Sequence, residues 1–432
     1  MSQADFSPDL KLQPYWWDHV PRPDLPAADL PKRVDVLIVG SGYTGLNAAL
    51  VTARGGRETL VIDAEDAGFG CSTRNGGQIS TSIKPTYEKL AARLGADLAF
   101  RIKREGFSSR EWVEELVRRE RIDCDFEVNG RFHGAHNPAQ YEALARQLAS
   151  QPKGLEQPYH MVPRAEQRRE LGTDAYFGGA VYEAHAGVDP ARLHQGLLER
   201  VREAGAVVVP HTRATGIEPD GSGFRVTTSR GTVAARDVVV ATNGYTEGVT
   251  PWLRRRVIPI GSYIVATEEL PTDLVERLFP TRRVTGDTRR LVYYYRASPD
   301  GKRVLFGGRV SLTETDPKVS GPLLRAELVR LFPELAPYRI SHTWCGFVAY
   351  TFDELMHCGR HDGVWYAMGY CGSGVGMANY LGMRIGQQVL GQAEGRTAFD
   401  GLPFQTRPFY TGNPWFLAPS IRYYRWMDSR PI

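Results

Sequence analysis

The chain has 432 residues, of which 42% are hydrophobic and 24% charged, which is typical of a globular enzyme with more than one domain. The 53 Lys and Arg residues nearly balance the 49 Asp and Glu residues, so the net charge of +4 does not indicate a nucleic-acid-binding protein. The five cysteines form no Cys-x-x-Cys pair, and no apolar run could cross a bilayer. We therefore expect no disulfide framework, no metal site and no transmembrane segment. Residues 1–31 lack the layout of a signal peptide, which favours a cytoplasmic protein.

A strand, a helix and a second strand are predicted in turn near the N-terminus. Val34–Val39 is rich in β-branched residues and reads as a buried strand. Thr44–Arg54 has apolar residues at helical spacing, and Thr59–Ile62 is a second strand. A strand, helix and strand within about 30 residues match the size of a βαβ unit. The sequence thus predicts a parallel sheet that begins here.

The turn between the first strand and the helix carries a Gly-x-Gly-x-x-Gly motif. Its first Gly allows a tight turn, the second lets the backbone approach a pyrophosphate, and the third lets the helix pack on the strand. The helix N-terminus offers unpaired N–H groups to phosphates. Asp63, which ends the second strand, can accept hydrogen bonds from a ribose. The predicted dinucleotide-binding residues are Gly40, Ser41, Gly42, Tyr43, Thr44, Gly45, Asp63 and Ala64.

A second polar, glycine-containing segment follows closely, Ser72-Thr-Arg-Asn-Gly-Gly-Gln78. Adjacent glycines beside polar side chains suit a backbone that lies against a flat ring or a phosphate. The alternative is an ordinary surface loop.

The middle of the chain alternates between helical and strand-like patterns. Residues 85–151 are mainly helical and charged, and we interpret them as a covering segment. A helix at 190–205, a strand at 206–209, a hairpin at 224–235 and a buried strand at 237–241 follow. The runs at 262–267, 291–296 and 304–307 then predict a second, largely antiparallel sheet.

A third glycine-rich turn, Gly369–Gly376, follows a strand at 364–368 and opens a helix at about 377–390. The small residues Ala378, Gly382 and Gly386 let this helix approach a neighbour closely. Its N-terminus could stabilise the negative charge that a reduced flavin carries. The alternative is a tightly packed helix with a purely structural role.

Taken together, these motifs resemble the D-amino-acid-oxidase-like flavoproteins, and most closely their gamma-glutamylputrescine oxidase branch. The resemblance runs from about residue 15 to residue 395 and includes Val238–Gly244. It implies FAD, with adenine near Ala214 and the isoalloxazine ring between residues 75–78 and 372–376. The further residues that it places at the cofactor are Ser72, Thr73, Arg74, Asn75, Gly76, Gly77, Gln78, Ala214, Thr242, Asn243, Gly244, Gly346, Gly372, Gly374, Val375 and Gly376.

The predicted fold is α/β (α+β overall), with a Rossmann-type FAD-binding domain interleaved with a largely antiparallel-sheet substrate domain. We expect the FAD-binding domain to comprise residues 30–90, 150–250 and 336–395. The substrate domain comprises 91–149 and 251–335, and 396–432 form a C-terminal tail. The tail is rich in aromatic residues and Arg, so it could contact a membrane surface, although packing on its own protein is the commoner outcome.

The resemblance implies oxidation of an amine by hydride transfer to flavin N5, followed by hydrolysis of the imine to a carbonyl compound. Oxygen or an electron carrier would reoxidise the flavin. Since the cofactor supplies the chemistry, we assign no catalytic side chain. We expect Tyr263, Tyr295 and Arg296 at the substrate, with ordinary sheet packing as the alternative for the tyrosines. We expect non-covalent FAD, because Cys345 is one residue out of register with the cysteine that links flavin in some relatives.

The positions at which some relatives hold a small carboxylate look empty here. Gly376 replaces a basic residue, and residues 79–83 contain no Arg. We therefore expect a longer amine with a polar or anionic end, such as gamma-glutamylputrescine or an aminoalkyl phosphonate, held by Arg289, Arg290 or Arg296. Alternatives are an amino-acid dehydrogenase that passes electrons to a carrier, a nicotinamide-dependent flavin reductase or monooxygenase, and a non-catalytic flavin-binding subunit. The oligomeric state stays open.

Overall fold

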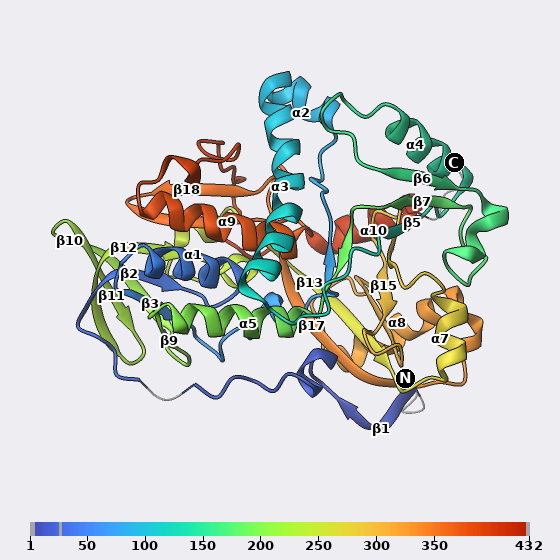
Figure 1. Ribbon diagram of the computed structural model, residues 1–432, viewed down its shortest axis with the longest axis horizontal. Helices are drawn as coiled ribbons and strands as arrows, with labels where there is room; N and C mark the ends of the chain where they lie inside the picture. Colours follow the sequence, from blue (N-terminus) through green and yellow to red (C-terminus); the bar gives the residue numbers. More distant parts are fainter. Residues whose placement is uncertain (1–4, 26–27, 429–432) are drawn as a thin grey trace.

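An eight-stranded sheet and a nine-stranded sheet divide the chain between them in the computed structural model, which describes residues 5–25 and 28–428 (Figure 1). The last four residues of the predicted tail, 429–432, lie outside the described residues. The helices are α1 Tyr43–Arg54, α2 Tyr87–Leu94, α3 Ala96–Glu120, α4 Pro138–Ala149, α5 Pro190–Glu203, α6 Pro251–Arg254, α7 Thr272–Leu278, α8 Pro317–Leu331, α9 Gly374–Val389 and α10 Leu417–Asp428.

The eight-stranded sheet contains the predicted βαβ unit, and its order is β10-β11-β12-β2-β3-β9, with β19 joining β12 and β18 joining β19. Its strands are β2 Arg33–Val39, β3 Thr59–Ile62, β9 Val207–Val209, β10 Ala214–Asp220, β11 Gly223–Thr228, β12 Gly231–Val240, β18 His357–His361 and β19 Val364–Met368. Strands β12, β2, β3 and β9 pair in parallel. The predicted elements of this part are confirmed, except that the second strand of the hairpin and the strand at 237–241 form one strand, β12. Burial on both faces of a parallel sheet explains the apolar runs in β2, β3 and the end of β12.

Helix α9, which begins at the third glycine-rich turn, packs directly on α1. A Cβ at Gly382 would lie 2.4 Å from the carbonyl oxygen of Thr44, and one at Gly386 would lie 2.8 Å from the Val51 side chain. The buried amide of Asn47 also donates to Asn379 Oδ1 at 2.8 Å. The predicted close approach through small residues is therefore confirmed, and it places the first turn of α1 against the middle of α9.

The nine-stranded sheet has the order β1-β17-β13-β16-β15-β14-β5-β7-β6. Its strands are β1 Phe6–Lys11, β5 Arg131–Gly134, β6 Tyr159–Val162, β7 Gly179–Tyr182, β13 Ile258–Thr267, β14 Val284–Asp287, β15 Tyr294–Ala297, β16 Val304–Gly308 and β17 Ile340–Tyr350. A two-stranded sheet joins β4 Gln78–Ile79 to β8 Ala186–Gly187. One face of the large sheet packs on α7 and α8 in a core that includes Val265, Phe306 and Phe332.

The two sheets divide the chain differently from the expected ranges. In the nine-stranded sheet, β7 pairs with β5 and β6 pairs with β7, although both strands fall within 150–250. Strand β17 pairs with β13 there, although it falls within 336–395. Helix α3, expected with the substrate domain, shares a core with α1 and α9 through Ile102 and Leu116. Local patterns predict that a strand exists, but its partner depends on contacts between distant segments.

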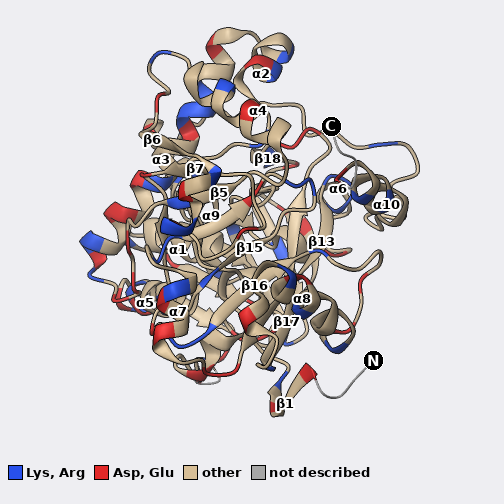
Figure 2. Cartoon of the chain, turned by 90° about the vertical axis from the view of Figure 1, so that its right-hand side faces the viewer, with Lys and Arg blue, Asp and Glu red and all other residues tan. Residues whose placement is uncertain are grey.

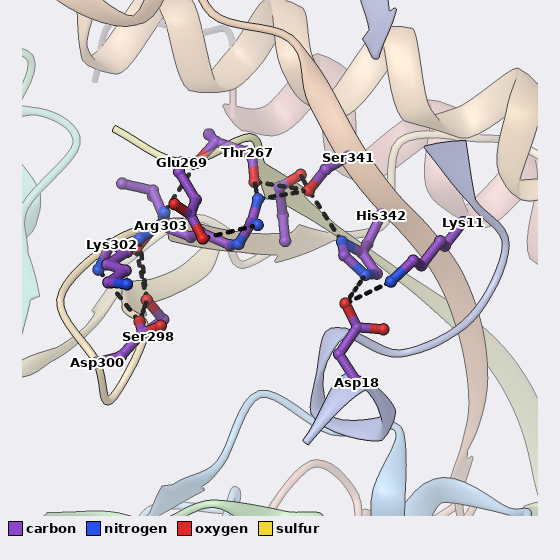
Figure 3. Close-up of polar contacts among 12 residues, drawn as sticks. Lys11, Asp18, Thr267, Glu269, Ser298, Asp300, Lys302, Arg303, Ser341 and His342 are labelled. Carbon is purple, nitrogen blue, oxygen red and sulfur yellow. Dashed lines mark hydrogen bonds and ion pairs between the residues drawn. The ribbon is translucent and has the colours of Figure 1, made fainter. Parts of the chain in front are cut away.

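The N-terminal segment is tied to the edge of the nine-stranded sheet by a polar network (Figure 3). The Asp18 carboxylate binds Lys11 Nζ at 2.8 Å and His342 Nε2 at 2.9 Å. Arg303 Nη1 donates to the Thr267 carbonyl at 2.8 Å, beneath the same strand edge. These contacts hold Tyr15–Asp18 against the protein, so that Trp16 is fully buried beside the site described below.

Acidic and basic residues are interspersed along the cartoon in Figure 2, as the balanced composition predicts. Among the described residues, the helices are all too short or too polar to cross a membrane.

Candidate active site

A cavity of about 1030 Å³ lies where the two sheets meet. One end is formed by the carboxyl ends of β2 and β3 and by residues around Ala214. The other end lies beneath β13 and β17 and reaches the turn that opens α9. Ligands of open α/β sheets bind outside the carboxyl ends of the strands, so the cavity lies where a dinucleotide is expected.

The glycine fingerprint has the conformation that a pyrophosphate site requires. Gly40 has a φ of +107°, and a Cβ at Gly45 would lie only 1.8 Å from the Gly40 carbonyl oxygen. A Cβ at Gly42 would lie 2.8 Å from Ser72 Oγ. No side chain caps the N-terminus of α1, although Ser72 Oγ accepts the Tyr43 N–H at 2.9 Å. The helix end is thus open to an anion.

Asp63 lines the cavity beside this turn and is held by its neighbours. Its Oδ2 accepts hydrogen bonds from the Ser41 N–H at 2.8 Å and from Ser41 Oγ at 2.6 Å. Its Oδ1 accepts the Glu65 N–H at 3.1 Å. Burial raises the pKa of the carboxyl, and the hydrogen bonds from Ser41 oppose that shift. The oriented carboxylate can accept further hydrogen bonds from a ribose.

Behind the fingerprint, His194 supports the Ser41 backbone. Its Nε2 lies 2.8 Å from the Ser41 carbonyl oxygen, and its side chain is buried. Burial lowers the pKa of His194 to about 4, so the ring is neutral at pH 7 and its Nε2–H donates to the carbonyl. No local pattern in the sequence indicates this contact.

The segment 72–78 is a fixed wall of the cavity rather than a surface loop. Asn75 Nδ2 donates to the carbonyls of Cys71 and Ser72, and its Oδ1 accepts the Gly77 N–H at 2.8 Å. Two buried indoles hold the segment from outside, because Trp16 Nε1 donates to the Asn75 carbonyl and Trp344 Nε1 to the Arg74 carbonyl, both at 2.9 Å.

The turn before α9 meets the end of β12 at the cavity. Asn243 Oδ1 accepts the Gly369 N–H at 3.0 Å, which joins the two predicted segments. Asn243 and Cys371 have positive φ angles of 44° and 49°, and Gly372 has a φ of 98°. No side chain caps the N-terminus of α9 at Ser373. A second helix end is therefore open to the cavity, 330 residues along the chain from the first.

Most of the predicted cofactor residues line the cavity: Gly40, Gly42, Tyr43, Thr44, Asp63, Ala64, Ser72, Arg74, Asn75, Gly76, Gln78, Ala214, Thr242, Asn243, Gly346, Gly372, Gly374 and Val375. The remaining predicted residues stand behind the lining: Ser41, Gly45, Thr73, Gly77, Gly244 and Gly376. Close packing explains their residue types, since a Cβ at Gly77 would lie 2.1 Å from the Val188 carbonyl oxygen and one at Gly244 would lie 2.6 Å from that of Phe347.

Strands β13 and β17 of the nine-stranded sheet contribute side chains to the cavity. Ile258, Ile260 and Ser262 of β13 line it, as do Val348 and Tyr350 of β17. Alternate residues of a strand point to opposite faces, and these strands pair in register. Ser262 Oγ lies 2.7 Å from the Tyr294 hydroxyl, and both side chains belong to the lining.

The three expected substrate residues do not line the cavity. Tyr263 and Tyr295 lie on the opposite face, in the core beneath α7 and α8, and are almost fully buried. The preceding residues, Ser262 and Tyr294, face the cavity instead. On each strand, the residue that faces the cavity is therefore the one before the expected residue. Arg296 is buried, and its guanidinium donates to the carbonyls of Gly77 and Val188, both at 3.1 Å.

Several cations line the cavity, among them Lys84, Arg131, Arg290 and Arg309. Arg290 does so, whereas its neighbour Arg289 forms an ion pair with Asp287. Lys84 lines the cavity with its Nζ 4.9 Å from the centre of the Tyr350 ring. Burial disfavours the charge on Lys84, but Tyr350 and Glu354 outweigh it and hold the pKa above its usual value. Lys84 is thus a cation at neutral pH that the sequence analysis had not placed at the site.

Cys345 is not part of the lining, whereas Cys71 and Cys371 are. Burial raises the pKa of both lining thiols to about 12. The thiolate is the reactive form of cysteine, so neither side chain is activated for attack at neutral pH.

The C-terminal tail packs on its own protein and reaches the cavity. Phe416, Leu417, Ser420, Ile421 and Tyr424 belong to the lining. The aromatic content of the tail was the one sequence signal of this role.

Comparison with known proteins agrees with this geometry. The family model described as FAD dependent oxidoreductase matches residues 35–388. This chain belongs to that family. It is 32% identical to gamma-glutamylputrescine oxidoreductase of Escherichia coli (strain K12) over 91% of this chain and 92% of the relative. It is 31% identical to the probable oxidoreductase OrdL of Rhizobium meliloti (strain 1021) over 86% of each chain.

Among solved structures, glycine oxidase from Geobacillus kaustophilus superposes with a TM-score of 0.72 at 20% identity, covering 88% of this chain and 99% of that one. The protein is therefore an FAD-dependent oxidoreductase of the DAO family. The cavity fits the cofactor, because two uncapped helix ends, a cradle in which glycine is obligatory and an oriented carboxylate line one continuous space.

Proposed function

We propose that the protein oxidises the carbon–nitrogen bond of an amine, and that the imine product hydrolyses to a carbonyl compound. Bound FAD would accept the hydride equivalent at N5 and pass the electrons to oxygen or a carrier. The family and the named activity of the 32% identical relative support this reaction class.

The chain's own residues would orient the amine and exclude water. Tyr294 and Ser262 form a hydroxyl pair on the sheet above the cavity, and Tyr294 lies against Gly76, where a Cβ would be 3.0 Å from its ring. The tyrosine thus stands between the expected ring-binding segment and the sheet. We assign it the role of orienting the substrate.

We further propose a longer amine with a polar or anionic end. The observation that carries this proposal is the pair of cations, Lys84 and Arg290, at the substrate end of the cavity. Neither residue is at a position where some relatives hold a small carboxylate. A cation forms strong charge-assisted hydrogen bonds with a carboxylate or phosphonate. A gamma-glutamylated diamine and an N-alkyl aminoethylphosphonate both have the required shape.

Steady-state kinetics with sarcosine, glycine, D-alanine, gamma-glutamylputrescine and an N-alkyl aminoethylphosphonate test the proposal. We expect one of the two longer amines to have the highest kcat/KM. Replacing Lys84 by Met should raise the KM for that amine and leave the KM for an alkylamine without an anionic end unchanged. If sarcosine or D-alanine is preferred, the proposed substrate class is wrong.

A further inference from the structure

The C-terminal helix α10 forms a wall of the cavity, although it lies beyond residues 35–388, which the family model matches. Its residues Leu417, Ser420, Ile421 and Tyr424 have the spacing of one helix face. All four line the cavity, and Ile421 is only 3% exposed. On the opposite side of the helix, Tyr423 is 54% exposed.

Both ends of α10 are fixed to loops of the nine-stranded sheet. At its C-terminal end, the Asp428 carboxylate accepts the N–H groups of Arg290 at 3.1 Å and Leu291 at 3.3 Å. Arg425 donates to the Val310 carbonyl oxygen. Before its N-terminal end, the Phe416 ring lies 6.2 Å from the ring of Phe352. Figure 2 shows α10 at the side of the molecule.

Asp428 ties the helix to the same loop that supplies Arg290 to the cavity. That loop also places Leu291 and Val292 in the lining, and β13 adds Ile258 and Ile260. The side chains of α10 that face them are apolar at Leu417 and Ile421. This part of the cavity therefore has aliphatic groups on α10, on β13 and on the loop at 290–292, beside charged lining residues that include Lys84, Arg131, Arg290, Arg309 and Glu354.

We propose that α10 is a specificity element, and that its Leu417–Ile421 face packs on an unbranched alkyl chain of the amine. This inference rests on the proposed function. It specifies the part of the substrate that lies between the amine nitrogen and the anionic end. Burying one methylene group favours binding by about fourfold. Each added methylene should thus tighten binding until the chain fills the space beneath α10.

The first experiment measures anaerobic flavin reduction by gamma-glutamyl derivatives of unbranched diamines of increasing length. The double variant Leu417→Ala, Ile421→Ala should lose at least tenfold in kcat/KM for the best amine, mainly through KM, and should flatten the dependence on chain length. Tyr423→Ala is the matched control, and it should behave like the wild type. Equal length dependence in the double variant and the control would overturn the proposal.

The second experiment needs no amine. Dithionite reduces accessible flavins directly, so the rate at which it bleaches the holoenzyme reports access to the cavity. Ending the chain after Gly412 should speed bleaching several-fold at unchanged FAD content, and the double variant keeps the test valid if the truncated chain does not fold. An unchanged rate in both would show that α10 does not cover the cavity. If dithionite bleaches the variants faster than the wild type but no amine reduces the wild-type flavin, the proposed function fails. The covering role of α10 then stands.

Discussion

Replacing Asp63 by Ala tests how the fingerprint holds FAD. The change removes the acceptor of three hydrogen bonds, from the Ser41 N–H, Ser41 Oγ and the Glu65 N–H. It also removes the group that we expect to accept hydrogen bonds from the ribose. A lost partner that leaves polar groups unpaired costs about 1–3 kcal/mol, so the Kd for FAD should rise by about 5- to 150-fold.

Two comparison variants should lose less FAD affinity than Asp63→Ala does. Asp63→Asn retains one carbonyl oxygen and should lose about 1 kcal/mol. Asp66→Ala removes the same charge three residues away, where the carboxylate pairs with Arg22 and His211 outside the cavity lining, and it should leave the FAD affinity unchanged.

Titration of the FAD-free protein with FAD, followed by flavin fluorescence, measures the Kd, and urea unfolding of the same FAD-free proteins measures their stability. If Asp63→Ala binds FAD as tightly as Asp66→Ala does, Asp63 is not a ribose ligand and the assignment of the fingerprint is wrong. A loss of FAD-free stability without a loss of affinity would give Asp63 a purely structural role.

Four further predictions concern other parts of the site. FAD should leave the protein on acid precipitation, because Cys345 lies outside the cavity lining; yellow pellet would contradict this. Gly45→Ala should purify without FAD, judged by its absorbance spectrum, since the added Cβ would lie 1.8 Å from a backbone oxygen. Tyr294→Phe should retain FAD and raise the KM for the amine, whereas an unchanged KM would remove Tyr294 from the substrate site. The pKa of His194 is lowered to about 4 from about 6.5 in the unfolded chain, so the free energy of unfolding should fall by about 3 kcal/mol as the pH falls through that range, and His194→Gln should reduce the slope.

Most of the residues predicted at the cofactor line one cavity, because local sequence patterns determine the geometry of this end. A strand, three spaced glycines and a helix dictate their own geometry, and a positive φ at Gly40 needs no distant partner. The same holds for the turn at Cys371–Ser373, which ends a strand and opens α9. Residues whose conformation depends only on neighbours in sequence could therefore be predicted, and their contact with FAD stays a prediction.

The substrate end depends on which face of a strand meets the other sheet, and the sequence leaves that choice open. Tyr294 and Tyr295 are equally aromatic neighbours, yet only Tyr294 reaches the cavity. Lys84 lies in an irregular stretch between β4 and α2, so no periodicity indicates its direction. The contact of α10 with the cavity joins segments more than 130 residues apart, which no local pattern can reveal.

Anaerobic mixing of the purified yellow protein with gamma-glutamylputrescine, followed by the flavin absorbance, tests the central claim most directly. The account predicts that this amine, or another long amine with an anionic end, bleaches the flavin completely and yields one equivalent of carbonyl product per FAD. Bleaching by a reduced nicotinamide nucleotide, with none by any amine, would contradict the account and assign the cavity to a different class of flavoenzyme.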